Sequence, residues 1–304
     1  MSSSSRCPYA SLTSALDDVG SPLRQYLDST FPNRQPLQTA HRAAAGALLV
    51  SGGEAVNPGT AGAAFDFMVR LVMDPSHIPQ VATSGAANAA VSSDVFFAVV
   101  QTGQEAAAVC RSAAAPEELA RAAWALALYT EVYRIGMVVP GSPLSVVVEA
   151  SSDAVLGVAS SAAVRELQEL HALATHNLYP ALPDPPNRLV AGPTFAASRL
   201  CAADADLVID GMLLETKARL GSKNARTGRR SDSLSLVDLY QLLGYVLFDH
   251  EDTYSLDRVA FYSARYGVLT TWPLQEFLEL LHGGPVNLAH EREQVWALLG
   301  GPAR

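Results

Sequence analysis

The sequence predicts an α/β (α+β) fold, in which a large N-terminal helical region precedes a mixed sheet flanked by helices. Two observations lead to this prediction. Apolar residues recur at helical spacing through about the first 180 residues. After a proline-rich segment at 179–193, the pattern changes to short apolar runs, turns and helices. We therefore divide the chain into a helical region of residues 1–187, packed on a core of residues 188–304.

The helical region is rich in alanine and is interrupted by proline and glycine. Segments 117–137 and 154–173 carry apolar residues at the spacing of helices. Proline–glycine pairs at 58–59 and 140–141 mark breaks between helices. Residues 179–193 hold too much proline for a helix or a central strand, so we expect a connecting segment there.

The core is expected to begin with two short strands around a turn at Asp210–Gly211. A basic loop at 217–230 and a helix at about 235–248 come next. Strands follow near 258–263 and 268–272, and helices at 274–281 and 287–298 close the chain.

Composition limits the classes of function. No stretch approaches the roughly 18 apolar residues of a membrane span, and the N-terminus lacks the pattern of a signal peptide, so we expect a cytoplasmic protein with no membrane partner. The separated Cys7, Cys110 and Cys201 fit free thiols in a reducing compartment. The net charge of −9 opposes a broad electrostatic grip on nucleic acid, so any such site must be local.

The turn at Asp210–Gly211 fixes a predicted register between the first two strands. Asp–Gly is a strong signal for a two-residue hairpin turn. Asp206 then faces Glu215, and Asp204 faces Lys217. Because strand side chains alternate, these four polar residues share one face of the hairpin. The other face is apolar and consists of Leu207, Ile209, Met212 and Leu214.

This polar face has the residues of a metal-dependent hydrolase. Two opposed carboxylates with Cβ atoms roughly 5 Å apart repel each other. A hard divalent cation, Mg²⁺ or Mn²⁺, would compensate Asp206 and Glu215 and leave positions for water and phosphate. Lys217 would orient or deprotonate a metal-bound water and stabilise charge on the phosphate. The alternative is a solvated hairpin face with a cross-strand salt bridge.

Lysine usage favours the catalytic interpretation. The chain has nineteen arginines and two lysines, Lys217 and Lys223. An arginine would serve a salt bridge equally well, whereas it cannot readily act as a base or as a compact proton donor. A lysine two residues after Glu215 therefore points to chemistry.

These residues resemble the PD-(D/E)xK nuclease superfamily, whose signature is an acidic residue on one strand and an acid-x-Lys triplet on the next. Asp206 and Glu215-Thr216-Lys217 match it. The RecB-like and lambda-exonuclease-like branches add a Gln-x-x-x-Tyr helix, which Gln241 and Tyr245 match. The resemblance covers about 80 residues. It implies a restriction-endonuclease-like fold, metal ligands from Asp206, Glu215 and the Thr216 carbonyl, and an orienting or strand-contacting role for the helix pair.

Relatives in these branches often take one further metal or water ligand from an earlier helix. Asp66 lies where a Gly-x-x-x-His helix of such nucleases carries histidine, and Glu131 is a second candidate. Both have a simpler interpretation as intrahelical ion pairs, Asp66 with Arg70 and Glu131 with Arg134. A charged residue within an otherwise apolar helix does require a partner.

The loop at 217–230 is the local positive patch that an acidic nucleic-acid-binding protein needs. It holds six of the 21 basic residues, and its glycines suggest mobility. We expect it to contact phosphates, and the alternative is a solvated loop. The candidate contacts are Lys223, Arg226, Arg229 and Arg230.

The sequence thus predicts a Mg²⁺- or Mn²⁺-dependent nuclease that hydrolyses phosphodiester bonds in DNA. By analogy of fold, such an enzyme often works in phage defence or DNA repair. Two alternatives stay open: a nuclease-like scaffold that binds nucleic acid or a protein partner without cutting, and an RNA-directed nuclease. A protein partner or a second copy of the chain could supply further binding surface.

Overall fold

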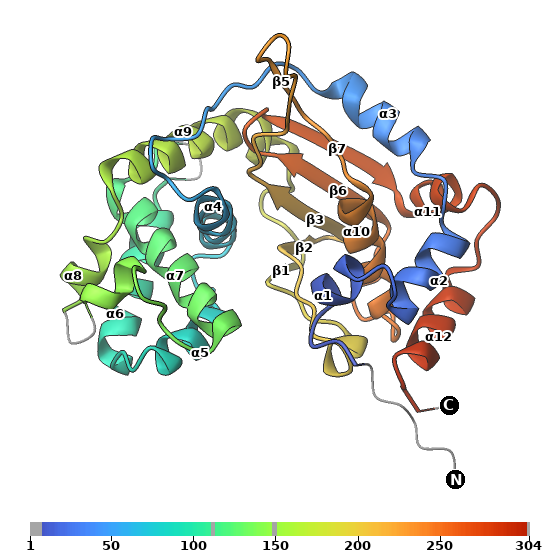
Figure 1. Cartoon of the computed structure of the whole chain (residues 1–304), viewed down its shortest axis with the longest axis horizontal. Coiled ribbons are helices and arrows are strands. Elements are labelled where there is room, and N and C mark those ends of the chain that lie inside the picture. The colour runs from blue at the N-terminus through green and yellow to red at the C-terminus, as the bar shows by residue number, and fades with distance from the viewer. Residues whose placement is uncertain (1–7, 111–112, 148–150, 303–304) are drawn as a thin grey trace.

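The computed structural model describes residues 8–110, 113–147 and 151–302, which form a mixed α/β structure (Figure 1). A five-stranded sheet has the order β1-β2-β3-β6-β7 and is covered by helices on both faces. The third and fourth strands of this order are parallel, and the other neighbours are antiparallel. The strands are β1 (Leu189–Ala191), β2 (Leu207–Ile209), β3 (Met212–Lys217), β6 (Arg258–Ser263) and β7 (Val268–Pro273).

Where β2 and β3 pair, their hairpin has the predicted register, but the ladder ends before the predicted pairs of Asp206 with Glu215 and Asp204 with Lys217. Ile209 pairs with Met212 and Leu207 with Leu214. Asp210 and Gly211 both have positive φ, of 45° and 80°, as a tight hairpin turn between twisted strands requires. Helix α10 (Leu236–Phe248) connects β3 to the parallel β6, and its bounds, like those of β6 and β7, agree with the sequence prediction to within one residue.

One face of the sheet packs against the helices on the left of Figure 1. The apolar residues predicted for one face of the hairpin, among them Leu207 and Leu214, are buried in this layer. The predicted helix at 154–173 is two helices in the structure. The first, α8, ends at Leu156 with Gly157 as its C-cap, and the Ser160 side chain caps the start of α9. The helices are α4 (Pro58–Met73), α5 (Gln80–Asn88), α6 (Ser93–Ala107), α7 (Glu117–Ile135), α8 (Ser152–Leu156) and α9 (Ser161–Asn177).

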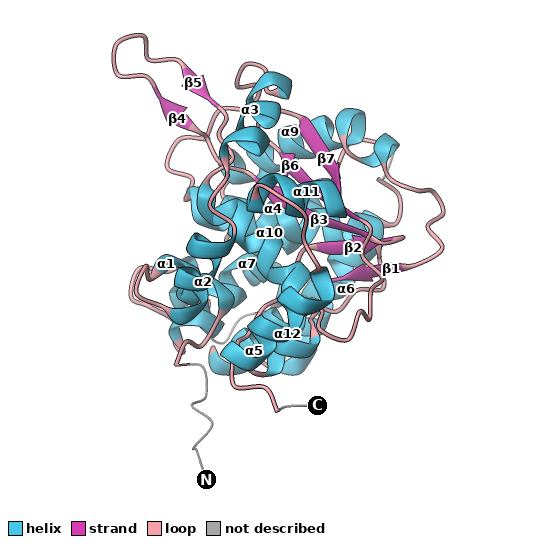
Figure 2. Cartoon of the chain, turned by 90° about the vertical axis from the view of Figure 1, so that its right-hand side faces the viewer, coloured by secondary structure: helices cyan, strands magenta, loops and turns pink. Residues whose placement is uncertain are grey.

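The opposite face is covered by both ends of the chain (Figures 1 and 2). Val208 and Leu213, which alternate with the residues above, point into this second core. The first three helices therefore lie across the sheet from α4–α9, and residues 1–187 do not form one layer. The helices here are α1 (Leu12–Asp17), α2 (Pro22–Thr30), α3 (Gln35–Ala44), α10, α11 (Leu274–His282) and α12 (Leu288–Leu298).

The two segments expected to be irregular both contain short strands. The proline-rich connection includes β1, which is an edge strand, where proline neighbours do least harm. The basic loop includes β4 (Ser222–Lys223) and β5 (Arg230–Ser231), which pair as a hairpin that projects from the body in Figure 2. Single 3₁₀ turns lie at Pro143–Val146, Tyr179–Ala181 and Ala196–Arg199.

Two further expectations from composition can be compared with the structure. Cys110 and Cys201 are both buried, whereas Cys7 lies outside the described residues. Among the helices that the structure describes, none has both the length and the apolar composition needed to cross a membrane.

Candidate active site

Asp206 lies immediately before β2 and binds the end of β3. Its Oδ2 accepts hydrogen bonds from the backbone N–H of Thr216 at 2.6 Å and from the Thr216 hydroxyl at 2.9 Å. The ladder of the hairpin ends at the pair Leu207 and Leu214, so Asp206 reaches β3 through its side chain. Asp206 is only 7% exposed, and its position is thereby fixed next to Glu215 and Lys217.

Glu215 is a buried carboxylate with an incomplete set of partners. It is 2% exposed. The Nζ of Lys217 lies 2.5 Å from its Oε1, while its Oε2 is buried with no hydrogen-bond partner among the described residues. Burial, followed by the negative charge of Asp206, raises the pKa of Glu215 well above its usual range. The raised pKa shows that the protein by itself does not supply enough positive charge to stabilise Glu215 as an anion beside Asp206.

Helix α4 contributes an ion pair between Asp66 and Arg70, which lie one helical turn apart. Arg70 binds Asp66 through two parallel charged contacts, from Nε to Oδ1 at 2.9 Å and from Nη2 to Oδ2 at 2.8 Å. The intrahelical pair is therefore confirmed, and it also belongs to the site. The same Nη2 lies 3.3 Å from Oδ1 of Asp206 and 3.6 Å from Oδ2 of Asp204.

Four carboxylates and two cations thus meet where α4 passes the ends of β2 and β3. We call Asp66, Asp204, Asp206 and Glu215 the acid cluster. Arg70 and Lys217 are the cations in contact with it, which leaves an excess of two negative charges when all six groups are ionised. That excess equals the charge of one divalent cation.

Lys217 is held as an ammonium ion in this arrangement. Burial alone would lower its pKa, but the neighbouring Glu215 and Asp206 carboxylates outweigh burial and raise it. The side chain is 26% exposed, so solvent and ligands can reach it. Because a charged ammonium group cannot accept a proton, Lys217 is better suited to stabilising a phosphate than to deprotonating water, the other role expected from the sequence.

The predicted pair on α10 faces the acid cluster. Gln241 Nε2 donates to the Tyr245 hydroxyl at 2.6 Å, as the spacing of four residues predicts. Tyr245 is 4% exposed, and burial together with the charges of Glu215 and Asp206 raises its pKa well above the usual value. Phe195 stacks on the Tyr245 ring at 5.6 Å. No sequence signal identified Phe195, since it lies in an irregular segment before β2.

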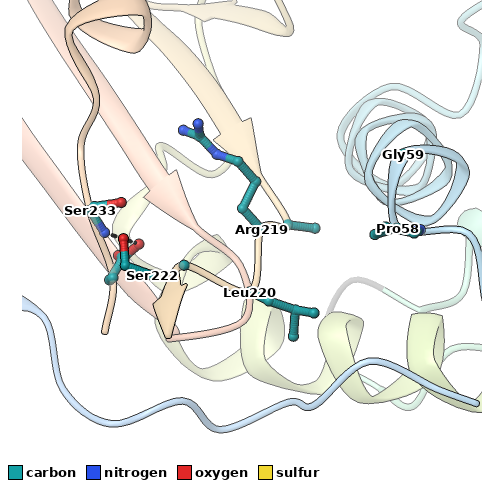
Figure 3. A pocket seen from close by; sticks show the side chains of 9 residues that line it. Pro58, Gly59, Arg219, Leu220, Ser222 and Ser233 are labelled. Atoms are coloured by element: carbon teal, nitrogen blue, oxygen red, sulfur yellow. Dashed lines mark hydrogen bonds between the residues drawn. The ribbon is translucent and has the colours of Figure 1, made fainter. Parts of the chain in front are cut away.

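A second unanticipated pair lies beside Lys217. Arg219 Nη2 is 2.5 Å from Oδ2 of Asp238, a residue that also closes the capping box of α10 with Ser235. Asp238 precedes Gln241 by three residues, so the helical spacing in the sequence could have predicted that both lie on the same face of α10. Arg219 also lines a pocket of about 480 Å³ between the first turn of α4 and the segment after β3, with Gly59 across from it (Figure 3).

Other sequence candidates lie away from the cluster. Glu131, on α7, accepts a hydrogen bond from the hydroxyl of Thr60, and no contact that the structure gives for it reaches the acid cluster. On the projecting hairpin, the four basic candidates divide into two kinds. Arg230 is half-buried and donates to the carbonyl of Gly221 at 3.1 Å, so it supports the hairpin itself. The other three are exposed: Lys223, Arg226 and Arg229.

The cluster provides the ligand chemistry of a hard divalent cation. Mg²⁺ is commonly held by only one or two carboxylates and keeps water or phosphate in its other positions. No group of three or more His, Cys, Asp or Glu in metal-binding geometry exists within the described ranges. Asp206 and Glu215, with the unpartnered Glu215 oxygen and the excess negative charge, do meet the smaller requirement.

No protein-family model, curated protein or solved structure matches this chain. Its function is therefore argued from the chemistry of the site. The acid cluster, Lys217 and the α10 pair are the groups that this chemistry offers.

Proposed function

We propose that this protein is a metal-dependent nuclease of restriction-endonuclease-like fold that hydrolyses phosphodiester bonds in DNA. The observation that carries the proposal is the convergence of Asp206, Glu215 and Lys217 at the end of one hairpin, with an unpartnered carboxylate oxygen. Tyr245 faces them from the helix that connects β3 to β6. The five-stranded mixed sheet with this crossover helix supports the fold assignment.

In the proposed reaction, Asp206 and Glu215 hold Mg²⁺ or Mn²⁺, and the Thr216 carbonyl is a further ligand by resemblance. When bound, the ion supplies Lewis acidity toward phosphate oxygens and lowers the pKa of water. The Lys217 ammonium orients the attacking water and stabilises charge on the phosphate. The water oxygen loses one proton to solvent and forms a new bond to phosphorus, one P–O ester bond breaks, and the leaving oxygen gains a proton from solvent.

The projecting hairpin supports nucleic acid as the substrate. Lys223, Arg226 and Arg229 are exposed on it, and its first strand follows β3 closely along the chain. Phosphate contacts of this kind position a duplex or single strand without reading its sequence. A localised patch of this size is the basic surface that a chain of net charge −9 needs.

A catalytically silent nucleic-acid-binding scaffold is the second candidate. It is favoured by one specific observation, the contact of Arg70 with Asp206, which engages an oxygen that a metal would need. An RNA-directed nuclease is the third candidate function, and the experiment below distinguishes among the three.

Purified protein and its Lys217→Ala variant should be incubated with labelled linear duplex, single-stranded and circular DNA and with RNA, in Mg²⁺, Mn²⁺ or EDTA. We expect metal-dependent DNA cleavage that falls by at least about 100-fold in the variant. Lys223→Ala removes the only other lysine and should weaken DNA binding while retaining turnover at saturating DNA. Retention of DNA without cleavage would establish the scaffold instead, and cleavage of RNA alone would change the substrate class.

A further inference from the structure

Arg70 is a buried cation with a closely defined position. It is 7% exposed, and its guanidinium lies 5.8 Å from the centre of the Phe67 ring. The chain passes very close to it at Gly192, where φ is +64° and a Cβ atom would lie only 2.7 Å from Nη1. The chain therefore leaves little space beside the guanidinium on the side of β1.

The contacts of Arg70 with its two buried carboxylates are unequal. The bonds to Asp66 measure 2.9 and 2.8 Å and form a planar fork, the strongest arrangement available to an arginine. The contact with Asp206 Oδ1 is longer, 3.3 Å, and is made by a single nitrogen. Arg70 is thus anchored by Asp66 and only loosely bound to Asp206.

Both carboxylate oxygens of Asp206 already have partners while Arg70 stays in place. Oδ2 already accepts two hydrogen bonds from Thr216, at 2.6 and 2.9 Å, which hold the end of β3. Oδ1 takes the long contact with Arg70. A cation that binds Oδ1 of Asp206 and the unpartnered Oε2 of Glu215 would therefore lie next to the guanidinium, and the two positive charges would repel each other.

We propose that Arg70 is the internal counter-ion of the acid cluster in the metal-free protein and that a divalent cation displaces it from Asp206. Asp66 then acts as the anchor of Arg70, in place of the metal-ligand role considered from the sequence. The inference rests on the proposed function only for the identity of the metal ligands. Arg70 is a positioning residue here, and its competition sets how tightly the site holds a divalent cation.

The test is a titration of the metal-free full chain with Mn²⁺, with free Mn²⁺ followed by electron paramagnetic resonance. We expect Arg70→Gln to bind Mn²⁺ at least about tenfold more tightly than the unaltered protein, because the variant removes a fixed positive charge that repels the metal ion. Arg70→Lys keeps the charge but loses the fork to Asp66, so it should also bind more tightly than the unaltered protein. Without metal, Arg70→Gln should melt at a lower temperature and recover when Mn²⁺ is added.

Arg219→Gln is the matched control, since it removes the same charge from the neighbouring pair with Asp238, outside the acid cluster. It should change Mn²⁺ affinity by less than about threefold. Equal tightening in Arg219→Gln and Arg70→Gln, with none in Arg70→Lys, would reduce the effect to net charge and overturn the proposal. Unchanged or weaker binding in Arg70→Gln would overturn it as well. If Arg70→Gln fails to fold, Arg70→Lys decides the question by the same measurement.

The titration contains no DNA, so the two proposals fail separately. If the unaltered protein cleaves DNA and Arg70→Gln binds Mn²⁺ no more tightly, only the counter-ion proposal is wrong. If Arg70→Gln binds more tightly and the unaltered protein cleaves nothing, only the nuclease proposal is wrong.

Discussion

Lys217 occupies a position whose acceptors suit a compact cation better than a planar one. Its Nζ lies 2.5 Å from Glu215 Oε1, on a carboxylate whose other oxygen has no partner among the described residues. An ammonium group has three donors around one point, so it can hold Glu215 and still face a phosphate. A guanidinium presents its donors in one plane and demands paired acceptors.

Lys217→Arg should therefore keep the fold and lose the activity. We expect a melting temperature close to that of the unaltered protein, because the charge next to Glu215 is retained. The rate of DNA cleavage at saturating Mn²⁺ and DNA should fall by about 100-fold or more. Single-turnover kinetics would measure this rate. Near-normal cleavage by Lys217→Arg would show that only charge is needed at this position.

His77 links a single residue to the acid stability of the whole chain. Burial, followed by the positive charge of Arg70, lowers its pKa from an ordinary 6.5 to about 4, and its Nε2 is buried without a hydrogen-bond partner in the described structure. The folded state therefore favours neutral histidine. Between pH 6.5 and 4 the unfolded chain binds the proton more readily, so stability is complete above pH 6.5 and is lost as the pH falls toward 4.

We expect this histidine to account for about 2–3 kcal/mol of the loss in unfolding free energy over that interval, after allowance for its partial exposure. His77→Gln should flatten the profile of urea midpoint against pH between 6.5 and 4. His290→Gln, on the exposed first turn of α12, serves as the control and should leave the profile unchanged. The same slope in His77→Gln as in the unaltered protein would assign the acid sensitivity to other groups.

The β4–β5 hairpin is the element on which nucleic-acid binding depends in our proposal. Its exposed basic residues do not form part of either hydrophobic core, so they can be replaced without loss of packing. Changing Lys223, Arg226 and Arg229 together to glutamine should weaken DNA binding and reduce the slope of log affinity against log salt by about 2–3. Fluorescence anisotropy over a range of salt concentrations measures both quantities.

The matched control removes three exposed arginines from other elements: Arg134, Arg165 and Arg258. It changes the net charge by the same amount and should leave the salt slope close to its original value. Equal losses in the two triple variants would mean that DNA senses the total charge of the chain and not the hairpin.

Elements with local signals were predictable, and those made by distant contacts were not. The Asp210–Gly211 turn fixed the β2–β3 register, and the Gln-x-x-x-Tyr spacing placed on one face of α10 the two side chains that the structure joins by a hydrogen bond. The strand β1 was missed because three residues among prolines carry no alternating pattern. It is a strand only because it pairs with β2, a contact that the local sequence does not indicate. The contact of Arg70 with Asp206 joins residues 136 positions apart, so no spacing rule could reveal it.

At the scale of the whole molecule, the sheet is enclosed between two helical layers, and one buried ion pair ties several distant segments together. Arg265, fully buried after β6, contacts Glu166 on α9. Its Nε also donates to the carbonyl of Ala218 at 2.6 Å, and Ala218 directly follows β3. The second oxygen of Glu166 accepts from the backbone N–H of Gly53 at 2.5 Å. This pair thus joins the helical layer to the strand that carries Glu215 and Lys217.

Breaking that pair from one side should be costly. Arg265→Met leaves the Glu166 carboxylate buried without its cation, and we expect a loss of about 3–5 kcal/mol in unfolding free energy. Glu166→Gln keeps an acceptor for Gly53, so the double variant should cost about 1–3 kcal/mol less than the sum of the single variants. Urea unfolding of all four proteins measures this coupling. Arg258→Met, at an exposed pair with Asp257, should cost less than about 1 kcal/mol, because exposed charges keep their hydration. Strict additivity at positions 166 and 265 would mean that the two side chains stabilise their layers independently.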